Sequence, residues 1–179
     1  MEENYFEKFT QEAKAALVYA QEKSAEANLS YVGTEHVLLG ILSQSNSLGA
    51  TILNGFGVSI SNVELVLKTV GRSKSSASST PLPTAKAAAL SGFAKQVIEN
   101  AVSCASRYGH NFVGTEHILF SLVSQDNTAA TVILENMKIN PKHIQNQLID
   151  AFQKNIGSQN APTGDMNPIE FFLNGLNGV

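Results

Sequence analysis

The pentapeptide Val-Gly-Thr-Glu-His occurs at residues 32–36 and again, 81 positions later, at residues 113–117. The flanking residues keep the same register without a gap, so that Tyr31 corresponds to Phe112. A repeated apolar pattern predicts a duplicated supersecondary unit. Packing alone rarely requires the same three polar residues twice. The repeated Thr-Glu-His therefore predicts a duplicated functional feature as well.

Composition restricts the class of protein. Apolar residues form 43% of the 179 positions, which is enough for a real core in one domain or two small ones. The net charge is −3 and the basic residues form no cluster, which argues against a nucleic-acid partner. No stretch approaches the roughly 18 apolar residues that span a bilayer, and Met1 is followed by two glutamates rather than by a basic secretory signal. With Cys104 as the single cysteine, we expect a cytoplasmic protein that contacts neither membrane nor nucleic acid.

Helical spacing of apolar residues predicts four helices around each copy of the pentapeptide. Thr10 and Thr34 are the expected N-caps of the first two helices, and Ser91 and Thr115 those of the fifth and sixth. Pro141 is the expected first residue of the last helix. No segment shows the period-two pattern of a strand. We therefore predict an all-α fold of eight helices, arranged as two four-helix repeats related by an approximate two-fold axis.

The duplication also predicts the domain organisation. One domain is expected over residues 5–154, comprising repeat one (5–71), a Ser- and Pro-rich linker (72–90) and repeat two (91–154). The tail, 155–179, is polar at first and ends in an apolar segment, 168–179. That segment is interpreted either as a disordered terminus or as a short motif that docks on this domain or on a partner.

Two stretches resemble the double repeat of the Clp N-terminal domain. They are FEKFTQEAKAALVYAQEKSAEANLSYVGTEHVLLGIL at 6–42 and FAKQVIENAVSCASRYGHNFVGTEHILFSL at 93–122. The resemblance covers roughly residues 5–154 and is closest to the ClpC-type branch of the Clp unfoldases. It implies eight helices in two pseudo-symmetric repeats. It also implies a non-enzymatic module that recruits protein substrates or adaptors for a ring-shaped ATPase, which feeds a protease ring.

The sequence departs from the family pattern in several places. Gly92 and Phe93 stand where relatives usually have Pro and Arg, and Phe120 and Ser121 replace the usual Leu-Gly. ClpC proteins continue into ATPase modules, but this sequence contains no G-x-x-x-x-G-K-[ST] motif, and residues 71–75 fail its glycine spacing. We therefore expect no ATP hydrolysis. A natural stand-alone protein and an excised domain both fit the sequence.

The chemistry of Gly-Thr-Glu at a helix start predicts a ligand. Unpaired backbone N–H groups at a helix start attract an anion, and the threonine adds a hydroxyl. The glutamate carboxylate pairs best with a planar guanidinium. Phosphoarginine carries both groups, and the resemblance implies that the glutamate of this motif lies in a phosphoarginine pocket once per repeat. The predicted ligand residues are Gly33, Thr34, Glu35, Gly114, Thr115 and Glu116. The alternative is that these residues only stabilise the helix start.

The remaining histidine and cysteine side chains offer little for catalysis or metal binding. His36 and His117 lack the spacing of a zinc site and are interpreted as structural residues that tie the helix start to the adjacent helix. Cys104 has no evident base or orienting partner, so a small hydrolase using Cys104 or a histidine is the weaker alternative. We predict no metal site, no cofactor and no catalytic residue.

A second surface is predicted at the starts of the first and fifth helices, which the duplication is expected to bring together. Phe6, Leu90 and Lys95 resemble an apolar patch with which relatives bind adaptors. The alternative is that Phe6 only seals the end of the core. A further functional alternative is a stand-alone accessory subunit that binds the Clp protease core.

Overall fold

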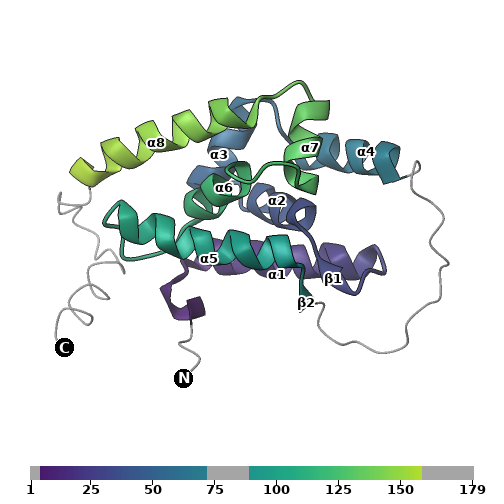
Figure 1. Ribbon diagram of the computed structural model, residues 1–179, viewed down its shortest axis with the longest axis horizontal. Helices are drawn as coiled ribbons and strands as arrows, with labels where there is room; N and C mark the ends of the chain where they lie inside the picture. The colour runs from purple at the N-terminus through teal and green to yellow at the C-terminus, as the bar shows by residue number, and fades with distance from the viewer. Residues whose placement is uncertain (1–4, 72–88, 159–179) are drawn as a thin grey trace.

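The computed structural model describes residues 5–71 and 89–158 (Figure 1). Within them lie eight α-helices, four in each repeat, and one short 3₁₀ helix that the sequence pattern does not predict. The first repeat contains η1 (Tyr5–Lys8), α1 (Gln11–Glu26), α2 (Thr34–Ser43), α3 (Leu48–Gly55) and α4 (Ile60–Gly71). The second contains α5 (Gly92–Arg107), α6 (Thr115–Val123), α7 (Ala129–Asn136) and α8 (Pro141–Ser158). The predicted all-α fold with eight helices is confirmed.

The helix starts follow from local chemistry. The Thr10 hydroxyl accepts a hydrogen bond from Ala13 N–H, and the Ser91 hydroxyl accepts one from Ala94 N–H, both at 3.2 Å. Both predicted N-caps are therefore confirmed, and each hydroxyl satisfies a backbone donor that the helix itself leaves unpaired. Pro141 begins α8 as predicted.

Two short backbone pairings join the repeats. Strand β1 (Tyr31–Val32) runs parallel to β2 (Ala89–Leu90), and an isolated parallel bridge joins Phe9 to Val113. The paired segments occupy corresponding positions in the two copies of the sequence, so the same contact is made twice across an approximate two-fold axis. The expectation of no strand is wrong for β1 and β2, because two residues are too few to show an alternating pattern.

These pairings fix the directions of α1 and α5. The N–H of Thr10, at the start of α1, donates to the Val113 carbonyl beyond the end of α5, at 3.0 Å. The N–H of Ser91, at the start of α5, donates to the Val32 carbonyl beyond the end of α1, at 2.9 Å. An α1 of 16 residues is about 24 Å long, so the two helix starts lie at opposite ends of this layer (Figure 1). The expectation that they lie near each other is therefore wrong.

Helices α2 and α6 form the centre of the molecule. They lie between the layer of α1 and α5 and the helices α3, α7 and α8 (Figure 1), and nearly all of their residues are buried. Gly40 of α2 lies so close to the Ala16 carbonyl of α1 that an added Cβ would collide with that backbone oxygen. The central position of α2 and α6 holds their first residues, which carry the pentapeptides, rigidly in place.

Among residues 5–71 and 89–158, no single helix is long and apolar enough to cross a membrane. The stretches Leu48–Gly55 and Ile60–Thr69 meet the length and composition criterion only as a pair, bent by 68°.

Candidate functional site: two helix-start corners

Each pentapeptide forms a corner at the start of a central helix. We call Gly33, Thr34 and Glu35 the first corner, and Gly114, Thr115 and Glu116 the second corner. The N-caps are the glycines, with extended backbones (φ −90° and −93°), so the threonines are the first helical residues. The prediction that Thr34 and Thr115 are N-caps is wrong.

Histidines complete the two helix starts. His36 Nδ1 accepts a hydrogen bond from Gly33 N–H, and His117 Nδ1 accepts one from Gly114 N–H, both at 2.9 Å. In each case the third helical residue reaches back to the N-cap backbone, as Glu or Gln does in a capping box. The histidines therefore have the structural role predicted for them, although each secures the start of its own helix.

The threonine hydroxyls cross to the opposite repeat. Thr34 Oγ1 accepts a hydrogen bond from Ala130 N–H of α7 at 3.2 Å, and Thr115 Oγ1 accepts one from Gly49 N–H of α3 at 3.1 Å. The two threonines are 3% and 1% exposed. Each hydroxyl therefore caps a helix of the opposite repeat inside the core.

The glutamate side chains are mostly buried, and their carboxylates fold back over their helix starts. The Glu35 and Glu116 side chains are 13% and 22% exposed. Each carboxylate lies against the preceding glycine, where an added Cβ would collide with it. Within the described residues neither carboxylate is paired with a lysine or arginine; the nearest cation-capable atoms are His36 Nδ1 at 3.6 Å and His117 Nδ1 at 3.5 Å. Both Nδ1 atoms already accept hydrogen bonds, so they are not protonated there.

The surroundings of the second corner disfavour the charged form of Glu116. Burial raises the pKa of Glu116, and the nearby carboxylate of Glu12 on α1 raises it further. Hydrogen bonds from the backbone N–H of Glu116 and from the Thr115 hydroxyl oppose that shift. The carboxylate thus occupies the anion position of its own helix start, but without an opposing cation.

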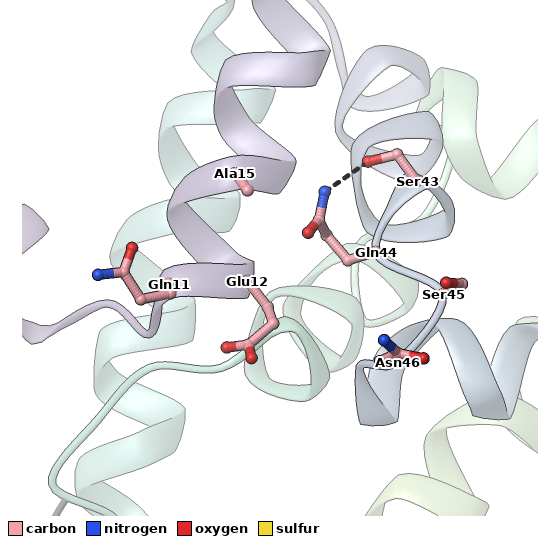
Figure 2. Close-up of a pocket in the computed structure, with 7 residues that line it drawn as sticks. All are labelled: Gln11, Glu12, Ala15, Ser43, Gln44, Ser45 and Asn46. Carbon is pink, nitrogen blue, oxygen red and sulfur yellow. Dashed lines mark hydrogen bonds between the residues drawn. The ribbon is translucent and has the colours of Figure 1, made fainter. Parts of the chain in front are cut away.

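A polar pocket of about 410 Å³ lies beside this second corner (Figure 2). It is lined by Gln11, Glu12, Ala15, Ser43, Gln44, Ser45 and Asn46. Figure 2 shows Glu12 on the α1 side and Asn46 on the α2–α3 loop, with Gln44 bonded to Ser43. The loop leads into α3, whose Gly49 N–H donates a hydrogen bond to the Thr115 hydroxyl. The charge of Glu12 also raises the pKa of Glu116. The pocket and the second corner are therefore neighbours.

A buried histidine pair distinguishes the second repeat. His117 Nε2 lies 2.7 Å from His110 Nδ1, and the His117 ring stacks on Phe152 with an interplanar angle of 6°. Because His117 Nδ1 accepts from Gly114, its proton is on Nε2 and is donated to His110. The proton of His110 must then lie on its own Nε2, which is buried without a partner among the described residues. Burial lowers the pKa of both rings, that of His117 to about 3.

The structure gives little support for cysteine catalysis or for metal binding in the described residues. Cys104 is 6% exposed, and burial raises the pKa of its thiol to about 11, so the thiol stays protonated and poorly nucleophilic near neutral pH. No group of three or more His, Cys, Asp and Glu residues within the described ranges is placed to hold a metal ion.

Comparisons with known proteins identify the family. The family model of the Clp repeat (R) N-terminal domain matches residues 8–91 and 89–169. The chain belongs to the Clp N-terminal domain family. It is 30% identical over 162 residues to chloroplastic ClpC1 of Arabidopsis thaliana and to a chloroplastic ClpA homologue of Brassica napus, covering 90% of this chain in both cases. It spans only 16% and 17% of the length of those two relatives.

Solved Clp N-terminal domains share the fold. That of ClpD from Arabidopsis thaliana gives a TM-score of 0.71 at 21% identity and covers 86% of this chain and 99% of that one. The N-domain of ClpV from Vibrio cholerae gives 0.63 at 16% identity, covering 83% and 87%. A complex of a ClpV N-domain with a VipB peptide gives 0.58 at 17% identity, covering 79% and 84%.

The predicted apolar patch of this Clp N-terminal domain is only partly described. Leu90 is half-buried and Lys95 is exposed at the start of α5, while the side chain of Phe6 lies outside the described residues. Leu90 pairs with Val32 beyond the end of α1. Leu90 and Lys95 therefore adjoin the first corner rather than the start of α1.

Sequence reasoning missed three residues of the two Clp repeats. Glu12 and His110 differ in type from their counterparts in the other repeat, Phe93 and Leu29, and this difference was the available signal. Gln125, whose amide N and O are both buried without a partner in the described part of the chain, gave no signal in the sequence.

Proposed function

We propose that this Clp N-terminal domain is a non-enzymatic recognition module of the Clp unfoldase–protease system, which docks proteins marked by phosphoarginine. One observation carries the proposal. In each repeat a glutamate carboxylate lies over the start of the central helix, and it has no lysine or arginine partner in the described structure. A carboxylate held in this way is available to form an ion pair with a cationic group of a ligand.

The geometry suggests how binding would proceed. In the free protein the carboxylate of Glu35 or Glu116 lies over the helix start, which favours a negative charge. A phosphate could take that position on the backbone N–H groups. The displaced carboxylate would swing outward and pair with the guanidinium of the same ligand through two parallel hydrogen bonds. The exchange keeps both the helix start and the acid satisfied.

Glycine at the N-cap is essential to this exchange. Neither Gly33 nor Gly114 has a positive φ, so alanine would fit the backbone without strain. The alanine Cβ would instead push away the carboxylate that lies against the glycine. Because the carboxylate is the far end of a flexible side chain, the fold should survive while the acid is misplaced.

The test is calorimetric titration of the chain with free phosphoarginine. We expect binding to the native protein and at least about a tenfold loss of affinity in the double variant Glu35→Gln, Glu116→Gln, since a charge-assisted guanidinium pair is worth roughly 1.5–3 kcal/mol. Gly33→Ala with Gly114→Ala should also weaken binding. Glu99→Gln, an exposed acid on α5, is the matched control. No binding to the native protein, or equal binding to the double glutamine variant, would refute the proposal.

Membership of the Clp system is tested separately. A pull-down with the full chain as bait should recover a Clp ATPase ring if the domain delivers substrates to it. Recovery of a Clp protease ring without the ATPase would favour the accessory-subunit alternative. The ClpV N-domain solved with a VipB peptide supports peptide docking by this fold. Leu90 and Lys95 are proposed as part of an adaptor contact beside the first corner, together with Phe6.

A further inference from the structure

Two side chains of the second repeat bury polar atoms that have no protein partner. Within the described residues, the Ser121 hydroxyl of α6 and both polar atoms of the Gln125 amide make no hydrogen bond. Ser124, which ends α6, keeps a helical backbone (φ −84°, ψ −11°), so Gln125 continues the helix path and shares a face with Ser121, four positions earlier. A buried polar group without a partner destabilises a fold, and native proteins satisfy nearly all of them. Ser121 and Gln125 therefore need a partner that the described part of the chain does not supply.

Gln125 lacks the partner that its counterpart has. In the first repeat, Gln44 Nε2 donates to Ser43 Oγ at 2.9 Å. The corresponding residues of the second repeat are Gln125 and Ser124, but there Ser124 Oγ accepts from Gln145 Nε2 of α8 at 3.1 Å. The α8 side chain therefore occupies the acceptor that corresponds to the partner of Gln44, and the Gln125 amide stays buried and unpaired among the described residues.

Ser121 also differs from its counterpart, which is Gly40 in α2. Gly40 packs so closely on α1 that an added Cβ would collide with the Ala16 carbonyl. The approximate two-fold axis places Ser121 against Val97 of α5, which corresponds to Ala16. A serine does not fit at the spacing of α1 and α2, and α5 contacts α6 less extensively than α1 contacts α2. The α5–α6 interface is therefore the wider of the two, although Ser121 is only 3% exposed.

We propose that the α5–α6 interface is a binding site for internal water, with at least one molecule hydrogen-bonded to both Ser121 and Gln125. Water matches the chemistry of this site, because the hydroxyl and the amide together offer donors and acceptors but no charge. A buried water makes about three hydrogen bonds to such groups, and the wider spacing of the two helices accommodates it. The α1–α2 interface takes no water at the corresponding position, where a glycine lies against backbone. The proposal is independent of any ligand at the two corners.

A crystal structure of the full chain that resolves ordered water tests the site directly. We expect a water oxygen about 2.7–3.2 Å from Ser121 Oγ and from one Gln125 amide atom, and none between Gly40 and Ala16. A direct hydrogen bond between Ser121 and Gln125 would overturn the proposal. Side chains that turn to backbone groups or to bulk solvent, with no shared water, would do the same.

Stability in solution gives an independent test. If water is bound, Ser121→Ala removes one of its partners and should raise the unfolding equilibrium constant about fivefold relative to the control. If the hydroxyl is simply unpaired, the same change removes a buried unsatisfied group, and the constant should fall. The matched control is Ser103→Ala, at an exposed helical serine of α5, because it reports the higher helix propensity of alanine alone. A Ser121→Ala variant more stable than this control would overturn the proposal.

A double-mutant cycle tests whether the two side chains share one molecule. Gln125→Met keeps the length of the side chain but removes the amide. Each single change removes a partner of the same water, so the double variant should raise the unfolding constant by at least about threefold less than the product of the single effects. Effects that multiply to within about twofold would contradict a shared water. A direct Ser121–Gln125 bond would give the same coupling, and the crystal structure distinguishes the two.

Discussion

The buried histidine pair of the second repeat makes the domain sensitive to mild acid. His117 is 1% exposed, and its pKa falls from 6.5 to about 3 because burial penalises the charged ring and His110 adds to the effect. In the unfolded chain the same ring titrates near 6.5. Below that pH the His117 ring binds a proton in the unfolded state but not in the folded state. Stability is therefore complete above about pH 6.5 and is lost as the pH falls toward 3.

The size of this loss follows from the shift. From pH 7.5 to pH 5, His117 alone should cost about 2 kcal/mol of unfolding free energy. His110 adds to the loss, since burial lowers its pKa in the same direction. Glu116 has the opposite sign: its raised pKa means that its protonation favours the folded state, which offsets part of the loss at low pH. The expected net loss is large compared with typical domain stabilities of about 5–15 kcal/mol.

Urea unfolding between pH 8 and pH 5 measures this directly. In the native protein the free energy of unfolding should fall steeply as the pH is lowered. In His117→Gln it should depend on pH much less, because glutamine can still accept a hydrogen bond from the N-cap backbone but does not titrate. His110→Leu, which introduces the residue found at Leu29 of the first repeat, should reduce this pH dependence in part. Glu116→Gln removes the contribution of Glu116, which has the opposite sign, so that the contribution of the histidines can be measured alone. A free energy of unfolding that is constant from pH 7.5 to 5, or a pH dependence unchanged by both histidine variants, would refute the conclusion that the folded state holds the histidine pair neutral.

Three further predictions concern the core. Thr34→Val and Thr115→Val each remove the acceptor of a helix N–H in the opposite repeat, so each should lower the unfolding free energy by about 1–2 kcal/mol in urea titrations. Gly40→Ala should cost about 3 kcal/mol because its Cβ meets a backbone oxygen, whereas Gly55→Ala, with open space around it, should be neutral or slightly stabilising. Cys104, with a thiol pKa of about 11, should react with a disulfide reagent at pH 8 about a hundredfold more slowly than a free thiol, and denaturant should abolish the difference.

Local patterns predicted most of the fold. Thr10 and Ser91 cap α1 and α5 through hydroxyl bonds to backbone three residues ahead, which is a short-range effect that sequence reveals. The order and number of helices followed from apolar spacing in the same way. The duplication added the approximate two-fold axis, because units of this size need a shared interface.

The parts that sequence could not predict are long-range. Thr34 looked like a local cap, but its hydroxyl binds an N–H 96 positions away, and that of Thr115 binds one 66 positions away. Glu12 acts on Glu116, more than 100 positions away, only because the chain folds back on itself. A pattern confined to one helix contains no information about such partners. Neither predicted glutamate is paired with a lysine or arginine in the described structure.

The reciprocal contacts explain which parts of the pentapeptide are free to take a ligand. Glycine leaves room for the carboxylate, threonine caps a helix of the other repeat, and histidine secures its own helix start. Each of these roles is filled in both repeats, because removing either copy would leave a buried backbone donor unpaired or a carboxylate displaced. The glutamate alone has no role of this kind, and it has no lysine or arginine partner in the described structure.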